Sequence, residues 1–174
     1  AYPGLYTIKG HYAFGLGSIN HSSVNSTLTE VIQMATNVTN LSSAFKYCNR
    51  LETVNVSAIN ATNLKDAFAE CNNLINIDLS NLNTENVTNM NSMFLNCKKL
   101  KQLDLSNFVT DKVNNMGSMF NGCVELTELD LNNFNTELVT NMNSMFNGCE
   151  KLTSLNVSSF DIKIKEYLKN GESY

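Results

Sequence analysis

The sequence predicts an α/β solenoid of stacked repeats, in which each coil contributes one short parallel strand and one short helical segment. Two observations predict this fold. All five cysteines of the 174-residue chain occupy one phase of a repeat, since the last four are evenly spaced and the first stands slightly closer to the second. In the first half of each repeat the apolar residues alternate with a period of two, and in the second half they follow the spacing of a helix. The cysteines are Cys48, Cys71, Cys97, Cys123 and Cys149.

The repeat divides the chain into an array and two end segments. The first two units are shorter than the three that follow them, and a last unit is incomplete. We expect residues 28–160 to form the array, residues 1–27 to cap its N-terminal end and residues 161–174 to cap its C-terminal end, because the ends of an array need a different outer face. The units begin at Leu28, Leu51, Leu74, Leu100, Leu126 and Leu152.

Each unit opens with the pattern L-x-x-L-x-L, which predicts a short strand. In the unit that starts at Leu100, alternation places Leu103 and Leu105 on one face of the strand and Asp104 on the other. Strands of successive coils would lie parallel to one another, so outward side chains at one position would form a column across the coils.

The second half of each unit predicts a two-turn helix. In the unit that starts at Leu100, four apolar residues follow one another at i, i+3, i+4 and i+7, which is the spacing of one helical face. They are Met116, Met119, Phe120 and Cys123. We expect a threonine or asparagine before the first methionine to start the helix, as Thr88 or Thr140 would. Asn96, Gly122 and Gly148 accept a left-handed conformation and would end it.

The methionines and cysteines of this segment are interpreted as core residues. Thioether and thiolate sulfur also suit Cu(I), so a metal site was the alternative. However, the longer units replace Ala44 and Ala67 by Met93, Met119 and Met145, and a longer coil encloses a wider interior that needs larger side chains. The two histidines, His11 and His21, precede this region and have no cysteine at metal-binding spacing. We therefore predict no metal site and five free buried thiols, although neighbouring coils are close enough for a disulfide.

Two further columns consist of small polar residues. One contains an asparagine before each expected helix, which we expect to hydrogen bond from coil to coil. These asparagines are Asn40, Asn63, Asn89, Asn115 and Asn141. The other column contains Thr84, Thr110 and Thr136. Ordered threonine rows occur on ice-binding surfaces, but this column lies in a loop beside acidic residues, so ice binding is a minor alternative.

Composition and motifs exclude several classes of function. The net charge is −4, and no basic patch with interleaved aromatic residues points to nucleic acid. No apolar run approaches the roughly 20 residues that cross a bilayer. The start, AYPGLY, resembles a trimmed or mature end. The chain has no Ser-His-Asp or Cys-His arrangement and no phosphate-binding glycine loop, so we predict that it is not an enzyme and needs no cofactor.

The motifs resemble those of the BspA-like (Treponema-type) leucine-rich-repeat proteins, including a related bacterial repeat family of unknown function. The segments NTENVTNMNSMFLNC and NTELVTNMNSMFNGC carry the resemblance, and the units with AFKYC and AFAEC look like its 23-residue form. The resemblance covers about residues 28–160. It implies a right-handed leucine-rich solenoid and a surface-exposed or secreted bacterial protein, often an adhesin for host matrix proteins or other cells. It implies no particular ligand residues.

The candidate binding site is the outward face of the strands, here named the strand face. Its central column is acidic, and the neighbouring column is polar. The eight candidate residues are Asn55, Asp78, Asp104, Asp130 and Asn156 in the central column, and Asn76, Gln102 and Glu128 in its neighbour. A third column contains Ser57, Ser80, Ser106, Asn132 and Ser158. We expect this face to bind a protein or a glycan.

Two alternatives stay open. Stacked aspartates repel one another, and their oxygens suit Ca²⁺, but a solvated acidic stripe is the simpler explanation. The array could also be a structural spacer or a self-associating element whose activity lies in flanking domains. The sequence predicts neither the ligand nor the oligomeric state.

Overall fold

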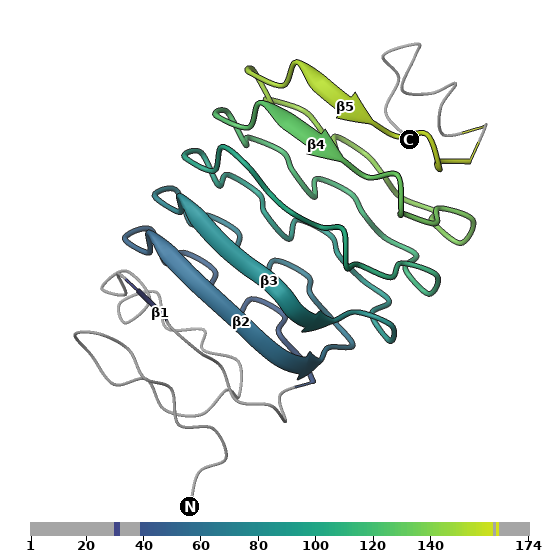
Figure 1. Cartoon of the computed structure of the whole chain (residues 1–174), viewed down its shortest axis with the longest axis horizontal. Coiled ribbons are helices and arrows are strands. Elements are labelled where there is room, and N and C mark those ends of the chain that lie inside the picture. Colours follow the sequence, from purple (N-terminus) through teal and green to yellow (C-terminus); the bar gives the residue numbers. More distant parts are fainter. Residues whose placement is uncertain (1–29, 32–38, 162, 164–174) are drawn as a thin grey trace, which may run out of the picture.

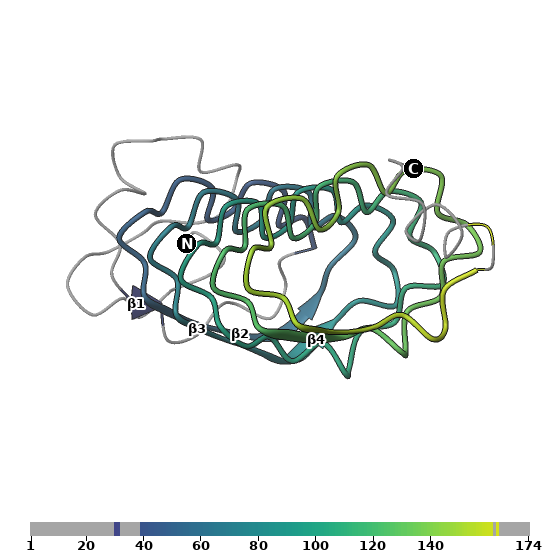
Figure 2. The ribbon, with the colours of Figure 1, turned by 90° about the horizontal axis from the view of Figure 1, so that it is seen from above.

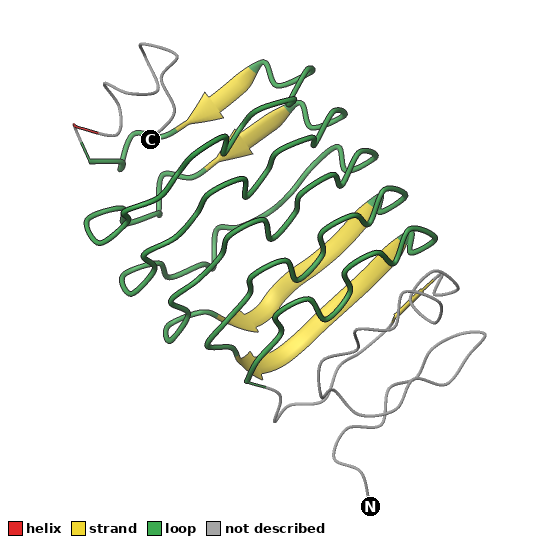
Figure 3. Cartoon of the chain, turned by 180° about the vertical axis from the view of Figure 1, so that it is seen from behind, coloured by secondary structure: helices red, strands yellow, loops and turns green. Residues whose placement is uncertain are grey.

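The structure is a computed structural model that describes residues 30–31, 39–161 and 163. In this part of the chain, successive coils lie side by side, so residues far apart in the sequence become neighbours (Figure 1). The strands occupy one side of the coils and a zigzag of turns occupies the opposite side (Figure 2). The core lies between these two layers. Most of each coil is loop and turn rather than regular strand (Figure 3).

The described residues contain five short strands, β1 (Glu30–Val31), β2 (Thr53–Asn60), β3 (Asn76–Asn83), β4 (Glu128–Asp130) and β5 (Ser154–Asn156). All pairings between them are parallel, as the sequence predicts. One sheet has the order β1-β2-β3 and the other contains β4 and β5. Thr53 pairs with Asn76, and Glu128 pairs with Ser154. The pairing therefore follows the repeat.

The strand expected at residues 103–105 is absent. This segment belongs to neither sheet, so the strand layer is interrupted between β3 and β4. Leu105 is still buried and Asp104 is exposed, as alternation predicts. Like charges opposite one another disfavour close pairing, and Asp104 in the interrupted segment is equivalent in the repeat to Asp78 of β3 and Asp130 of β4.

The predicted core is confirmed. The six methionines of the repeat are at most 2% exposed, and the phenylalanines of successive coils stack on one another. The ring centroids of Phe94 and Phe120 lie 5.9 Å apart, and those of Phe45 and Phe68 lie 5.2 Å apart. All five cysteines are free, four of them buried and Cys149 half-buried. Each of the last four thiols donates to a phenylalanine carbonyl of the preceding coil, as Cys97 does to Phe68 at 3.3 Å.

The predicted helix is wrong: residues 39–161 contain no helix. At residues 90–97, every second backbone N–H donates to the next coil, as Met90 does to Asn115 and Phe94 does to Met119, both at 2.9 Å. The other N–H groups after Asn91 donate three residues back, as Met93 does to Met90 at 3.2 Å. Each ribbon is therefore a chain of four-residue turns bonded edge to edge. We name residues 41–48, 64–71, 90–97, 116–123 and 142–149 the turn ribbons.

The reason for this error lies in the periodicity. The first and last residues of two consecutive four-residue turns stand at positions i, i+3, i+4 and i+7. A two-turn helix places the same four positions on one face. The observed ribbons need a left-handed residue once per turn. Ser92, Asn96 and Ser118 have φ values of 55°, 58° and 55°, and Gly122 and Gly148 have 74° and 72°. The expectation that Asn96, Gly122 and Gly148 adopt this conformation is confirmed, but they lie within turns and end no helix. Thr88 and Thr140, which were expected to start helices, do not start one.

The asparagine column also differs from the expectation. Its side chains accept hydrogen bonds within their own coil, from the N–H two residues ahead; Asn89 Oδ1 accepts from Asn91 at 2.9 Å. The coil-to-coil bonds are made by the backbone carbonyls of these asparagines, as from Leu64 N–H to Asn89 O at 2.9 Å. The asparagine side chains start the turn ribbons. Each forms an Asx turn, which gives the N–H two residues ahead an acceptor that the backbone of the ribbon does not supply.

The threonine column is buried, which argues against a role on an ice-binding surface. Thr110 is 1% exposed; its Oγ1 donates to Asn135 O at 3.0 Å and accepts from Asn135 N–H at 2.8 Å. Thr84 makes the same pair of bonds with Val109. At this corner of the coil, the threonine hydroxyls bond to the backbone of the next coil, in place of hydrogen bonds between the two backbones.

The end segments are largely outside the described residues. This holds for the predicted N-terminal cap with its two histidines and, apart from Asp161 and Lys163, for the predicted C-terminal cap. The boundaries of the array therefore stay a prediction. In the described part of the chain, no helix is long and apolar enough to cross a membrane.

Candidate functional site

The structure places the eight candidate residues together on the strand face. Parallel pairing sets Asn55 beside Asp78, and Asp130 beside Asn156. The Asn55 Nδ2 atom donates to Asp78 Oδ2 at 2.9 Å, and Gln102 Nε2 donates to Glu128 Oε1 at 3.5 Å. Six of the residues are exposed and two are half-buried, so all reach solvent. The exposed ones are Asn76, Asp78, Gln102, Asp104, Glu128 and Asp130, and the half-buried ones are Asn55 and Asn156.

The acidic column has a structural role that sequence reasoning missed. Asp104 Oδ1 accepts a hydrogen bond from the Ser106 N–H at 2.9 Å, and Asp130 Oδ1 accepts one from Asn132 at 3.0 Å. Asn156 makes the equivalent bond to Ser158 at 3.1 Å. Each side chain thus turns the backbone at the end of the strand segment. An asparagine serves as well as an aspartate, which is why both residue types occupy the column.

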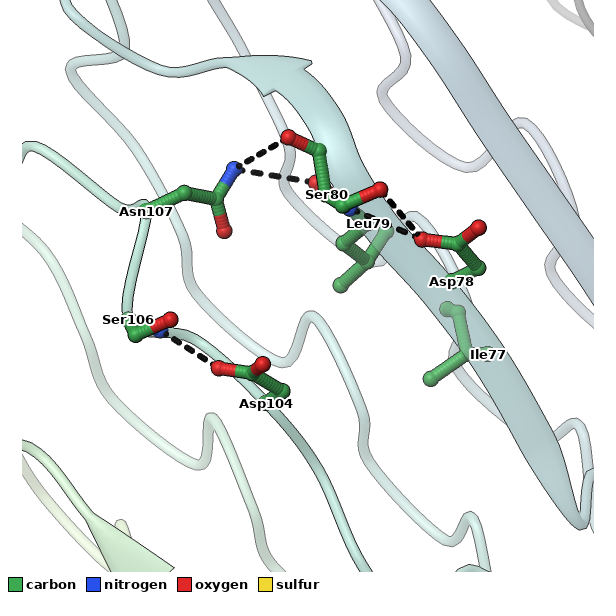
Figure 4. A pocket seen from close by; sticks show the side chains of 7 residues that line it. All are labelled: Ile77, Asp78, Leu79, Ser80, Asp104, Ser106 and Asn107. Atoms are coloured by element: carbon green, nitrogen blue, oxygen red, sulfur yellow. Dashed lines mark hydrogen bonds between the residues drawn. The ribbon is translucent and has the colours of Figure 1, made fainter.

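A cleft of about 300 Å³ opens on the strand face where the strand layer is interrupted (Figure 4). Asp78 and Ser80 line it from β3, and Asp104, Ser106 and Asn107 line it from the next coil. The apolar side chains of Ile77 and Leu79 also line it. The cleft therefore offers two carboxylates and hydrogen-bonding groups beside an apolar surface.

Hydrogen bonds orient both carboxylates of the cleft. Asp78 Oδ1 accepts from the Ser80 hydroxyl at 2.7 Å and from the Ser80 N–H at 3.0 Å. These bonds, the hydroxyl first, lower the pKa of Asp78 below the ordinary 3.8. The side chain of Ser106 and then its backbone N–H lower the pKa of Asp104 in the same way. Both groups are negatively charged near neutral pH.

Among the described residues, no group of three or more aspartates, glutamates, histidines or cysteines is arranged to hold a metal ion. The calcium hypothesis therefore gains no support from the geometry. Burial raises the pKa of Cys71, Cys97 and Cys123, which keeps these three thiols protonated and disfavours their use as nucleophiles.

Asn107 is a cleft residue that sequence reasoning missed. Its Nδ2 atom donates to the carbonyl oxygens of Leu79 at 3.0 Å and Leu82 at 3.2 Å, so it joins the two coils where no strand ladder does. Asn133 and Ser159 hold the equivalent position in the next two coils. The signal was a polar residue directly after the third column in the last four units, where Asn81, Asn107, Asn133 and Ser159 stand; the first of these five units has Ala58 there.

Stacked coils with shared columns of core, turn and surface residues define a repeat protein. The chain belongs to the family described as "Mycoplasma protein of unknown function, DUF285", whose model matches residues 20–102 and 62–170. The predicted membership of a bacterial repeat family is confirmed at this level.

Two other comparisons complete this result. The chain is similar in structure to a leucine rich cell surface protein from Faecalibacterium prausnitzii A2-165, with a TM-score of 0.44 and 18% sequence identity. The similarity covers 81% of this chain and 32% of that protein. No curated protein matches the chain.

Proposed function

We propose that this chain is a non-enzymatic recognition module of a bacterial surface or secreted protein, and that it binds a macromolecule on the strand face. The partner class is a host matrix protein, a glycan or a component of another cell, as for an adhesin. The right-handed leucine-rich solenoid and the surface location implied by the family resemblance belong to this proposal.

The observation that carries the proposal is the cleft between Asp78 and Asp104. The Oδ1 atom of each carboxylate is held by a turn, so the direction of the side chain is set before any partner arrives. Preorganised groups lose less entropy on binding. The negative charge favours a partner that presents lysine, arginine or hydroxyl donors, and the apolar side chains of Ile77 and Leu79 provide a contact surface beside them.

The test separates the charge of the column from its role in the fold. A triple variant with Asp78, Asp104 and Asp130 changed to asparagine removes three negative charges and keeps the turns, because Asn156 makes the same turn naturally. We would measure binding of both proteins to an array of matrix proteins, mucins and glycans, with calcium and with chelator. Circular dichroism would confirm that the variant is folded.

The expected result is a ligand that the original chain binds and the triple variant does not. A ligand lost from the original chain in chelator would indicate that Ca²⁺ bridges it to the strand face. A ligand bound equally by both proteins would contradict the site and move recognition to other surfaces.

The alternative function is a structural spacer or a self-associating array. One observation favours it: every acidic residue of the column already serves a turn, which explains the column without a ligand. The spacer predicts that no strand-face variant changes any binding, and that flanking domains bind instead.

A further inference from the structure

The tetrapeptide Phe-Asn-Gly-Cys occurs twice at equivalent positions, at residues 120–123 and 146–149. In both copies, the glycine has a positive φ and lies at a turn of its ribbon. The local sequence and turn are therefore the same. Only the surroundings differ, because the first copy lies inside the stack and the second belongs to the last turn ribbon.

An asparagine followed by glycine can modify itself. The glycine nitrogen, after losing its proton, attacks the Cγ atom of the asparagine side chain, and a N–Cγ bond forms as ammonia leaves. The resulting succinimide adds one water and opens to aspartate or to isoaspartate, which has an additional backbone methylene. Glycine hinders the attack least because it has no side chain.

In the first copy, the N–H of the attacking nitrogen is hydrogen bonded to the neighbouring coil. Gly122 N–H donates to Asn147 O at 2.8 Å, and Asn121 and Gly122 are half-buried. In the second copy, Gly148 N–H has no acceptor among the described residues, and Asn147 and Gly148 are both exposed. The nitrogen of Gly148 can lose its proton and move toward the side chain without breaking a hydrogen bond to any coil that the structure describes.

We propose that Asn147 is a site of spontaneous deamidation, and that the following coil protects the identical sequence at Asn121. The product has a consequence for the last turn ribbon. The bond from Cys149 N–H to Phe146 O, at 3.2 Å, closes the turn that contains Asn147 and Gly148. An isoaspartate lengthens this turn by one backbone atom and loosens Cys149, whose Sγ donates to Phe120 O at 3.1 Å.

The experiment compares the two copies in one molecule. The whole chain is incubated at mildly alkaline pH, with and without denaturant, and then cut after glutamates. Asn121, Asn147 and the further Asn-Gly pair at Asn170, outside the described residues, fall on separate peptides, namely 86–125, 138–150 and 167–172. Mass spectrometry and isoaspartate detection follow each site.

In the folded protein, we expect Asn147 to react about tenfold faster than Asn121 or more, because Gly122 must first lose a hydrogen bond. In denaturant, the two rates should be equal. Alkylation of Cys149 should rise with the deamidated fraction, and an Asn147→Gln variant should show neither change. Equal rates at both sites in the folded protein, or a slower rate at Asn147, would overturn the proposal.

Discussion

The Nδ2 atom of Asn133 donates a 2.8 Å hydrogen bond to the carbonyl oxygen of Phe108, 25 residues earlier in the chain. The same nitrogen donates to Leu105 O at 3.0 Å. One side chain thus satisfies two carbonyls of the preceding coil at the corner that follows the strand segment.

Changing Asn133 to alanine should lower the free energy of unfolding by about 1–3 kcal/mol, because partly buried carbonyls lose their donor. Urea denaturation measures this loss. Asn133→Ser is the matched control, since Ser159 Oγ donates to Leu131 O at 3.0 Å and Phe134 O at 2.7 Å from the equivalent position. Serine should retain most of the stability. Equal losses in both variants would contradict a role for these bonds.

Ser118 distinguishes the turn ribbon from a helix. Its φ of 55° is a left-handed conformation that glycine adopts more readily than other residues. We therefore expect Ser118→Gly to stabilise the protein by about 1 kcal/mol and Ser118→Ala to be neutral or destabilising. A helix would give the opposite order, since alanine is the best helix former and glycine among the worst. Thermal unfolding of the two variants decides between them.

Thr110→Val tests the threonine column. Valine has nearly the same shape but lacks the hydroxyl, so Asn135 N–H and Asn135 O both lose a partner beside a side chain that is 1% exposed. The expected loss of stability is about 1–3 kcal/mol. Thr136→Val should cost less, because Thr136 Oγ1 has one hydrogen bond, from Asp161 N–H at 2.8 Å, among the described residues. Chemical denaturation of the two variants gives the order.

Acidic pH should weaken the turns of the strand face. The pKa values of Asp78 and Asp104 are lowered in the folded chain, so their contribution to stability is present above the ordinary value of 3.8. That contribution is lost as the pH falls through the lowered values. A double Asp→Asn variant at these positions should show a weaker loss of stability between about pH 5 and pH 2. The same pH dependence in both proteins would contradict the assignment.

Alkylation should separate Cys149 from the other thiols. Burial raises the pKa of Cys149 to about 11, and burial also raises the pKa of Cys123. Cys149 is also the one half-buried cysteine. We expect Cys149 to react first and slowly at pH 8 in the folded protein, and all five cysteines to react quickly in denaturant. Rapid reaction of Cys97 in the folded protein would show that the core opens.

The residues that recur at a fixed spacing allowed most of this fold to be predicted. Met93 was expected in the core because longer coils carry larger residues there, Phe94 and Cys97 because they recur at one phase of the repeat, and all three are buried. The central column and its neighbour agree with the pairing of Asn55 with Asp78 and of Thr53 with Asn76, but the third column is wrong at Ser57, which pairs with Asn81 and not with Ser80. The helix was wrong because the apolar spacing of a seven-residue window suits a helix and a chain of four-residue turns equally.

The candidate site was predicted only in part. Asp78 and Asp104 were expected on one face, and they lie on the same cleft. Asn107 was missed, and so were the turns that hold the acids, because both depend on how a side chain meets the backbone of its own or the preceding coil.

The sequence by itself determined that the chain is a repeat protein, which residues face its core and which face solvent. Periodicity is sufficient for this, because equivalent residues in a stack must share an environment. The tertiary structure decided where the backbone hydrogen bonds go. Alternate N–H groups of the first four turn ribbons bond to the next coil, and the strand layer is interrupted at the segment that contains Asp104. The hydrogen-bond pattern and the interruption depend on the distance between neighbouring coils, and the sequence of a single repeat does not reveal that distance.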